Sequence, residues 1–90
     1  MLPILVPESS VLRFKYWDEV VREGIFFQNN FYTSIQRFGA DKRSIAFDRG
    51  CEIADQGFKI CITVSESGYV VWQELRALAH NGSLLQTVES

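Results

Sequence analysis

The sequence predicts an α+β domain: an antiparallel β-meander in the C-terminal half packs on an amphipathic N-terminal helix, and a short helix follows the last strand. Charged and apolar residues separate at helical spacing over residues 11–23. Beyond residue 43, short runs of β-branched and aromatic residues are divided by Gly50, Gly57 and Gly68. Because 90 residues with 47% hydrophobic content bury only one core, a single domain is expected.

We expect that compact domain to cover residues 1–82, with a loose tail over 83–90. The net charge of −2, with both signs interspersed, gives no strong field for a polyanion. The apolar start, residues 1–7, is far shorter than the ~20 residues that span a bilayer, and it lacks a basic signal segment. These features predict a cytoplasmic protein with no membrane partner. Cys51 and Cys61 fit reduced thiols.

The first predicted element is a helix over residues 11–23. Ser9 and Ser10 precede it as candidate N-caps, and Gly24 stands where a helix commonly ends. One stripe of its surface is charged: Lys15, Asp18, Glu19 and Arg22. The remaining apolar arc is wider than one sheet face requires and includes Phe14, Tyr16 and Trp17. A strand here would set Val11 and Trp17 beside Arg13 and Lys15, a poorer separation, so the helix is preferred.

Residues 25–38 carry signals for two structures. Asn29-Asn30 is suited to a hairpin turn, whereas Asn30 can equally cap a short helix that ends at Gly39. Phe31, Ile35 and Phe38 have helical spacing, although aromatic and β-branched residues favour strands. We expect the helix and keep the hairpin as the alternative.

The predicted meander has four strands: RSIAFD at 43–48, CEIA at 51–54, FKICITVS at 58–65 and YVVWQ at 69–73. Three-residue loops that end at Gly50 and Gly68 pair Phe47 with Cys51, Ile45 with Ile53, Val64 with Val70 and Ile62 with Trp72. Its apolar face would pack on the first helix.

The turn between the second and third predicted strands decides the relation of the two cysteines. A three-residue loop, 55–57, would set Cys51 opposite Cys61. The two-residue turn Gln56-Gly57 is preferred because it collects the large apolar residues on one face, with Ile53 opposite Ile60. The cysteines then point to opposite faces and cannot form a disulfide without a backbone shift. After the last strand, residues 74–80 read as a short helix that ends at Asn81-Gly82.

No sequence motif for catalysis, phosphate binding or zinc binding is present, so we expect no cofactor and no metal site. One histidine and two separated cysteines do not make a usual four-ligand zinc site. Covalent catalysis would need Cys51 or Cys61 as the nucleophile and His80 as the base, the one such set that the composition permits. Nothing in the sequence brings those groups together. A non-enzymatic protein is the expectation.

The excess of apolar surface predicts a small protein-binding or regulatory domain, acting as a homodimer or on an unidentified protein partner. The alternative of equal weight is that residues 1–7 and 31–38 of the same chain cover this surface. The nominated contacts are Tyr16, Trp17, Tyr69 and Val71. The alternative is a single-stranded nucleic-acid-binding domain, because basic residues lie among aromatic residues that can stack on bases. Its nominated residues are Arg37, Lys42, Arg43, Arg49 and Lys59. Acidic residues in the same segment oppose this alternative by cancelling the field.

Overall fold

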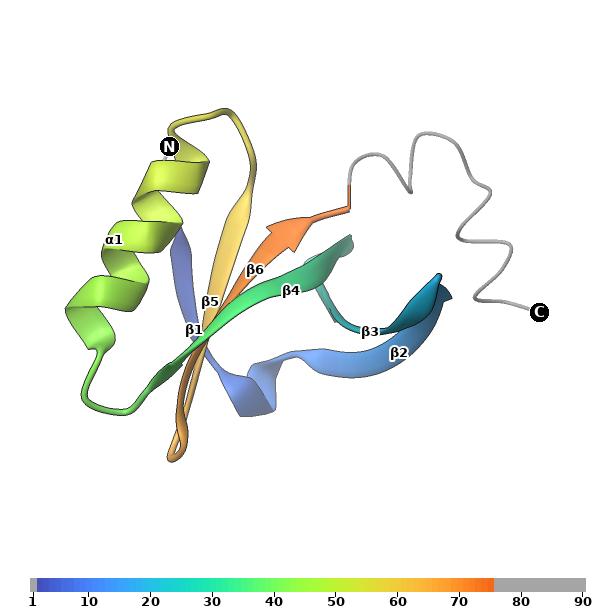
Figure 1. Cartoon of the computed structure of the whole chain (residues 1–90), viewed down its shortest axis with the longest axis horizontal. Coiled ribbons are helices and arrows are strands. Elements are labelled where there is room, and N and C mark those ends of the chain that lie inside the picture. The colour runs from blue at the N-terminus through green and yellow to red at the C-terminus, as the bar shows by residue number, and fades with distance from the viewer. Residues whose placement is uncertain (1, 76–90) are drawn as a thin grey trace.

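The computed structural model describes residues 2–75, which form a curved six-stranded sheet with one α-helix against part of one face (Figure 1). The elements in chain order are β1 (Ile4–Pro7), the 3-10 turn η1 (Glu8–Ser10), β2 (Leu12–Asp18), β3 (Val20–Phe27), β4 (Asn30–Gly39), α1 (Arg43–Ala54), β5 (Ile60–Ser65) and β6 (Gly68–Glu74). The strand order across the sheet is β1-β5-β6-β4-β3-β2. Strand β1 runs parallel to β5, and all other pairs are antiparallel.

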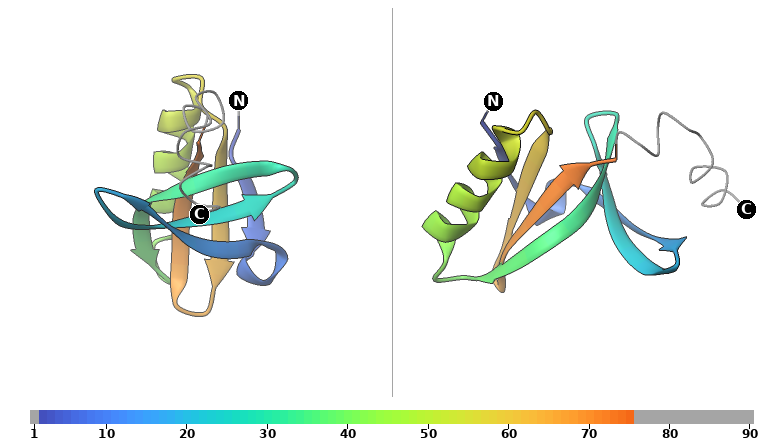
Figure 2. Two further views of the ribbon diagram at one scale, coloured as in Figure 1. Left: turned by 90° about the vertical axis from the view of Figure 1, so that its right-hand side faces the viewer. Right: turned by 45° about the horizontal axis from the view of Figure 1, so that its top comes forward.

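Two apolar clusters lie on the two faces of this sheet. Helix α1 covers the first, which contains Ala46, Ile53, Ala54, Ile60, Ile62 and Val71. The second lies inside the curve of the sheet and contains Val6, Val11, Ile25, Tyr32, Cys61 and Trp72. The β2–β3 hairpin extends away from the half of the sheet that carries α1 (Figure 2). Because both faces of the central strands β5 and β6 are covered, consecutive residues are buried and apolar: Ile60, Cys61 and Ile62 in β5, and Val71 and Trp72 in β6.

The predicted helix over 11–23 is wrong, since this segment forms most of the β2–β3 hairpin. The chain reverses at Glu19, whose φ is 66°. Arg13, one of the two basic residues that argued against a strand, pairs with Glu8 and Glu23. Lys15 stands opposite Glu23 in the register. Cross-strand charge pairs therefore place basic residues on the same face as apolar ones, which a single-segment pattern does not reveal.

Gly24, expected at a helix end, lies in the middle of β3 and serves packing. A Cβ at this position would lie 2.5 Å from Cζ of Phe14. The Phe14 ring occupies that space and contacts the ring of Phe31 edge-on at 5.7 Å. The aromatic residues read as one arc of a helix thus form a cross-strand cluster.

The expected helix in residues 25–38 is also wrong. The hairpin alternative is confirmed, but its turn lies one residue earlier than the predicted Asn29-Asn30. Gln28 and Asn29 form the turn between β3 and β4, with φ values of 50° and 65°. Two consecutive positive φ values suit a tight two-residue hairpin turn, which matches the twist of the flanking strands. Strand propensity of the aromatic and β-branched residues outweighed the helical spacing here.

The first two strands of the predicted meander do not exist, because residues 43–54 form α1. The buried residues of this helix are Ala46, Gly50, Ile53 and Ala54. Most of these buried side chains are small and therefore give only a weak helical hydrophobicity pattern. The large side chains of Ile45 and Phe47 are partly exposed. Gly50 was read as a turn residue but lies at a close helix–sheet contact. The predicted pairs of Phe47 with Cys51 and of Ile45 with Ile53 are absent.

Strands β5 and β6 were both predicted, but their register differs by one residue. Ser65 pairs with Gly68, so the loop has two residues, and Ile62 faces Val71 and not Trp72. Cys51 lies on α1 and Cys61 on β5, and both thiols are free. Of the helix predicted over 74–80, Glu74 belongs to β6, and residues 76–80 lie outside the described residues. The predicted domain end at residue 82 and the predicted tail over 83–90 lie outside them as well. The predicted N-terminal helix and four-strand antiparallel meander are thus replaced by a mixed sheet with one helix after its fourth strand.

Candidate functional site

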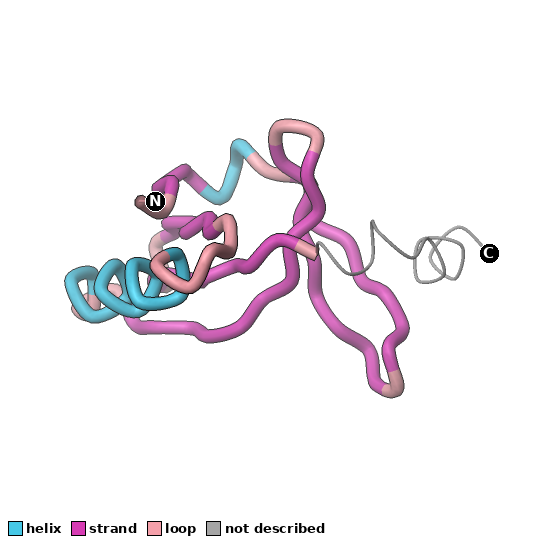
Figure 3. Tube along the Cα trace, turned by 90° about the horizontal axis from the view of Figure 1, so that it is seen from above, coloured by secondary structure: helices cyan, strands magenta, loops and turns pink. Residues whose placement is uncertain are grey.

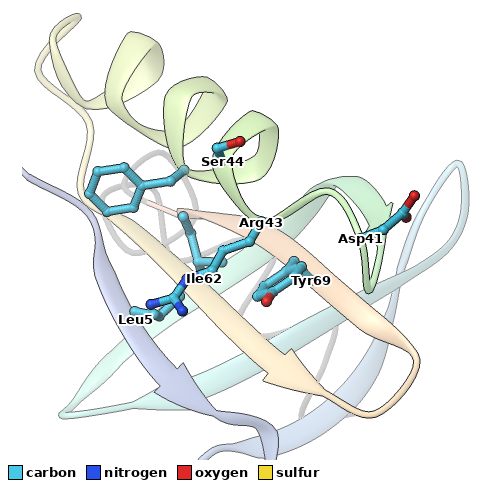
Figure 4. A pocket seen from close by; sticks show the side chains of 7 residues that line it. Leu5, Asp41, Arg43, Ser44, Ile62 and Tyr69 are labelled. Carbon is cyan, nitrogen blue, oxygen red and sulfur yellow. The ribbon is translucent and has the colours of Figure 1, made fainter.

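The candidate site is a groove between α1 and the edge strand β1. Helix α1 contacts β5, β6 and β4, and β1 lies beyond it at the edge of the sheet. The strip left between them is an open cavity of about 470 Å³ (Figure 4). Its lining residues are Leu5, Asp41, Arg43, Ser44, Phe47, Ile62 and Tyr69. The tube view from above shows the helix axis set beside the sheet and not across its full width (Figure 3).

The floor and walls of the groove are apolar. Leu5 stands next to Ile62 in the parallel β1–β5 pair, so both side chains point to the helix face. Ile62 is 1% exposed, whereas Leu5 is 40% and Phe47 38% exposed. Large apolar side chains exposed to that degree beside a buried floor offer area that a ligand can cover.

Gly50 holds the helix close to this floor. A Cβ at this position would lie 2.9 Å from Cδ1 of Ile62 and 3.3 Å from Cγ of Pro3. The helix backbone therefore approaches both β5 and the residue before β1. Pro3 is itself buried, so the groove is narrowed at the Pro3–Gly50 contact and opens toward the first turn of α1.

Arg43 supplies the one positive charge among the groove-lining residues. Its side chain leaves the first turn of α1 and extends over Ile62 in the direction of Leu5 (Figure 4). Within residues 2–75, Arg13, Arg22, Arg37 and Arg49 each form an ion pair with a carboxylate. The Arg43 guanidinium forms none with the described part of the chain.

The position of this charge is unfavourable for the helix. The first turn of α1 has no acidic residue, and the N-cap residue Lys42 makes no side-chain capping bond. Cations at a helix N-terminus oppose the helix dipole. Local rules of stability are most often broken where a residue is needed for function.

The open edge of β1 adjoins the groove. Only one side of β1 pairs, with β5, so its other side offers main-chain groups to an incoming strand. Pro7 and the preceding Pro3 lack N–H groups, which restricts such pairing to the short stretch between them.

The four nominated protein contacts do not share one surface. Tyr16 is 5% exposed and its hydroxyl donates to Oγ1 of Thr33 at 2.8 Å. Val71 is 0% exposed beneath α1, so neither residue offers a contact surface in this fold. Trp17 is 59% exposed near the tip of the β2–β3 hairpin, and Tyr69 lines the groove. Tyr69 is the one nominated contact that lies in the candidate site.

The five basic residues of the nucleic-acid alternative are also dispersed. Arg37 lies opposite Val70, on the face turned away from α1, and pairs with Glu23. Lys42 and Arg43 are at the start of α1, whereas Lys59 follows its end, about 18 Å away for a 12-residue helix. Arg49 pairs with Glu52. The structure does not gather these residues into one positive surface.

A second hollow, of about 400 Å³, lies on the face opposite α1. Its charged residues compensate one another: Arg13 pairs with Glu8 and Glu23, and Arg37 pairs with Glu23. The Arg13 guanidinium also lies 5.8 Å from the centre of the Trp72 ring. With these partners in place, the second hollow presents no unpaired arginine, which distinguishes it from the α1–β1 groove.

Sequence reasoning missed Leu5 and Phe47 as site residues. Leu5 belongs to the apolar start, which was weighed as a membrane or signal segment and as a cover for apolar surface, and Phe47 was assigned to a strand of the predicted meander. Arg43 was noted only for its charge. The signal that joins them is spatial, since α1 and β1 are far apart in the chain and meet only through β5.

The described residues show no prepared reactive group. Burial raises the pKa of the Cys61 thiol to about 11, which keeps it protonated at neutral pH. No group of three or more His, Cys, Asp or Glu side chains within residues 2–75 is arranged to hold a metal ion. Over the same range, no helix combines the length and hydrophobicity needed to cross a membrane. Comparison of the chain with protein-family models, with curated proteins and with solved structures gives no match.

Proposed function

We propose that this protein is a non-enzymatic binding domain that holds an extended segment of a protein partner in the groove between α1 and β1. The observation that carries the proposal is the apolar groove at an unpaired sheet edge, with Leu5 and Phe47 each more than a third exposed above the buried Ile62. An extended segment can satisfy main-chain groups on such an edge while alternate side chains enter the groove.

The composition of the groove supports binding over catalysis. Its lining residues include no histidine and no cysteine. Ser44 points its hydroxyl away from the groove centre in Figure 4, and Asp41 lies at the end remote from Leu5. An apolar floor with a few polar groups at its rim is the usual composition of a recognition pocket.

The test is selection from a library of random 12-residue peptides, followed by affinity measurement on groove variants. We expect selected peptides to share an apolar anchor residue. Leu5→Asp and Phe47→Asp should each weaken their binding by about tenfold or more, since a central apolar contact commonly contributes over 1.4 kcal/mol. Ile45→Asp is the matched control, because Ile45 is 50% exposed on the same helix but does not line the groove.

All three variants replace partly exposed residues, and circular dichroism would verify that each one folds. Backbone NMR shifts on peptide addition should map to α1, β1 and β5. Equal binding by wild type and both groove variants, or shifts confined to the β2–β3 hairpin, would disprove the proposal.

A further inference from the structure

We infer that the partner segment carries an aspartate or glutamate side chain beside its apolar anchor, and that Arg43 binds this carboxylate. The inference rests on the proposed function and adds the chemistry of the partner. It concerns one side chain of the groove that apolar contacts alone do not explain.

The first reason is that Arg43 has no partner in the described chain. The other arginines within residues 2–75 are all paired with carboxylates, including Arg13 and Arg37 on the opposite face. An arginine presents a planar fork of donors that matches a carboxylate with two parallel hydrogen bonds. The guanidinium at the groove is free to form that pair with a ligand.

The second reason is the direction of the side chain. Arg43 is exposed, and its side chain extends over Ile62 toward Leu5, so its charged end lies beside the apolar floor (Figure 4). A ligand side chain that fills the groove would exclude water around the guanidinium. Exclusion of water strengthens a charge-assisted hydrogen bond and raises the cost of leaving the cation unpaired.

The third reason is the charge at the rim. Arg43 and Asp41 are the two charged residues among those that line the groove. Asp41 turns toward its own chain, since a Cβ added at Gly39 would lie 3.2 Å from its Oδ1. Asp41 also lies at the end of the groove remote from Leu5, so Arg43 is the charge nearer the apolar floor, which favours an anionic ligand group.

The geometry favours an internal acidic side chain over a C-terminal carboxylate. A segment that pairs with the edge of β1 continues along the strand in both directions, and its side chains reach the groove at alternate positions. An anchor and an acidic residue two positions apart would point to the same side. The expected motif is thus an apolar residue with Asp or Glu two residues away.

The experiment repeats the peptide selection on wild type, Arg43→Glu, Arg43→Gln and the control Arg49→Glu. Arg49 lies on the same helix outside the groove, so its variant changes the net charge equally. We expect wild type and Arg49→Glu to enrich acidic residues near the anchor, and Arg43→Glu to enrich Lys or Arg instead. Arg43→Gln should weaken the selected acidic peptide by about tenfold.

Peptide variants separate the possible failures. Replacing the acidic residue by its amide should cost wild type about tenfold and leave Arg43→Gln unchanged, while C-terminal amidation of the peptide should change nothing. Groove-dependent peptides with no acidic preference would overturn this inference and leave the proposed function standing. Loss of binding on C-terminal amidation would also overturn it, because the carboxylate would then be terminal. Selected peptides that bind the Leu5→Asp and Phe47→Asp variants as tightly as wild type would disprove the proposed function itself.

Discussion

Trp72 shows how a polar atom is accommodated inside the curve of the sheet. Its indole nitrogen donates to Oγ1 of Thr63 at 2.9 Å, and the two side chains are 1% and 3% exposed. Thr63 is the one buried polar residue of the described chain. A buried donor costs little while it is bonded and much when its partner is removed.

Thr63→Val should therefore lower the free energy of unfolding by about 1–3 kcal/mol, because Val keeps the shape but leaves the indole N–H unbonded. Urea unfolding followed by tryptophan fluorescence measures the loss. Thr63→Ser is the control, since it keeps the hydroxyl and removes one methyl group. A Val variant as stable as the Ser variant would contradict this account of the pair.

Stability should also fall at alkaline pH through two core residues. Burial is the main cause that raises the pKa of Tyr32 from 10.0 to about 12, and burial raises the pKa of Cys61 from 9.0 to about 11. The unfolded chain loses these protons first, so the stabilisation is complete below pH 9 and is lost as pH rises toward 12. Each unit by which the folded-state pKa exceeds the unfolded-state pKa adds about 1.4 kcal/mol to the free energy of unfolding.

Urea unfolding between pH 8 and pH 11 tests this dependence. Cys61→Ala should be less stable at pH 8 because it leaves a cavity. Both Cys61→Ala and Tyr32→Phe should show a shallower decline of stability with pH than wild type. Identical slopes in wild type and both variants would contradict the assignment.

At the scale of elements, two glycines with positive φ perform different tasks. Gly57 has a φ of 98° and no atom within 4 Å of a Cβ placed there. Gly68 has a φ of 141°, and a Cβ there would lie 2.1 Å from the carbonyl oxygen of Phe38. The first needs glycine only for its backbone angle, whereas the second also allows β6 to start against the end of β4.

Gly57→Ala should cost about 1–2 kcal/mol of unfolding free energy, the usual penalty for a strained backbone angle. Gly68→Ala should cost about 3 kcal/mol or more, because backbone atoms of β4 must also move. Thermal unfolding of both variants gives the comparison. Equal losses of unfolding free energy in the two variants would contradict this account, because the close β4–β6 contact would then add no cost at Gly68.

Helix α1 provides a second prediction at this scale, which links stability to binding. Arg43→Glu should raise the free energy of unfolding by about 0.3–1 kcal/mol, since an anion suits the first turn of a helix. The same change should abolish binding of acidic peptides. Urea unfolding at low and high salt measures the gain, which should shrink with salt; a destabilised variant would show that Arg43 contributes to folding in another way.

At the scale of the whole molecule, the two edges of the sheet differ. Edge strand β1 is short and lies between prolines, whereas edge strand β2 has seven residues and no proline. Near the tip of the β2–β3 hairpin, Trp17 faces Val21 in the register, and these side chains are 59% and 63% exposed. An unpaired edge with exposed apolar side chains is prone to pair with another chain.

We expect a homodimer to form through the β2 edge. Sedimentation over a concentration series would show it, and Trp17→Lys should dissociate it, whereas Ile45→Lys on α1 should not. A monomer at every concentration would contradict the homodimer and leave the groove as the proposed binding surface.

Part of the fold could be read from the sequence because some signals are local. Alternation and the glycine at 68 located β5 and β6, and the Asn29 region carried the hairpin signal that proved right. Residues 43–54 could not be read correctly, because three of the four buried residues of α1 are Ala or Gly and only Ile53 is large. The β2 strand was misread in part because Arg13 pairs with glutamates from other segments of the chain.

The sequence by itself determined the mixture of helix and strand and the lack of a familiar catalytic motif, since these follow from composition and local pattern. Only the tertiary structure decided the candidate site. Leu5, Arg43 and Ile62 come from three separate elements, and the groove exists because β1 pairs in parallel with β5 beyond the reach of α1. The pairing of distant strands depends on contacts between segments, and no pattern within one segment records those contacts.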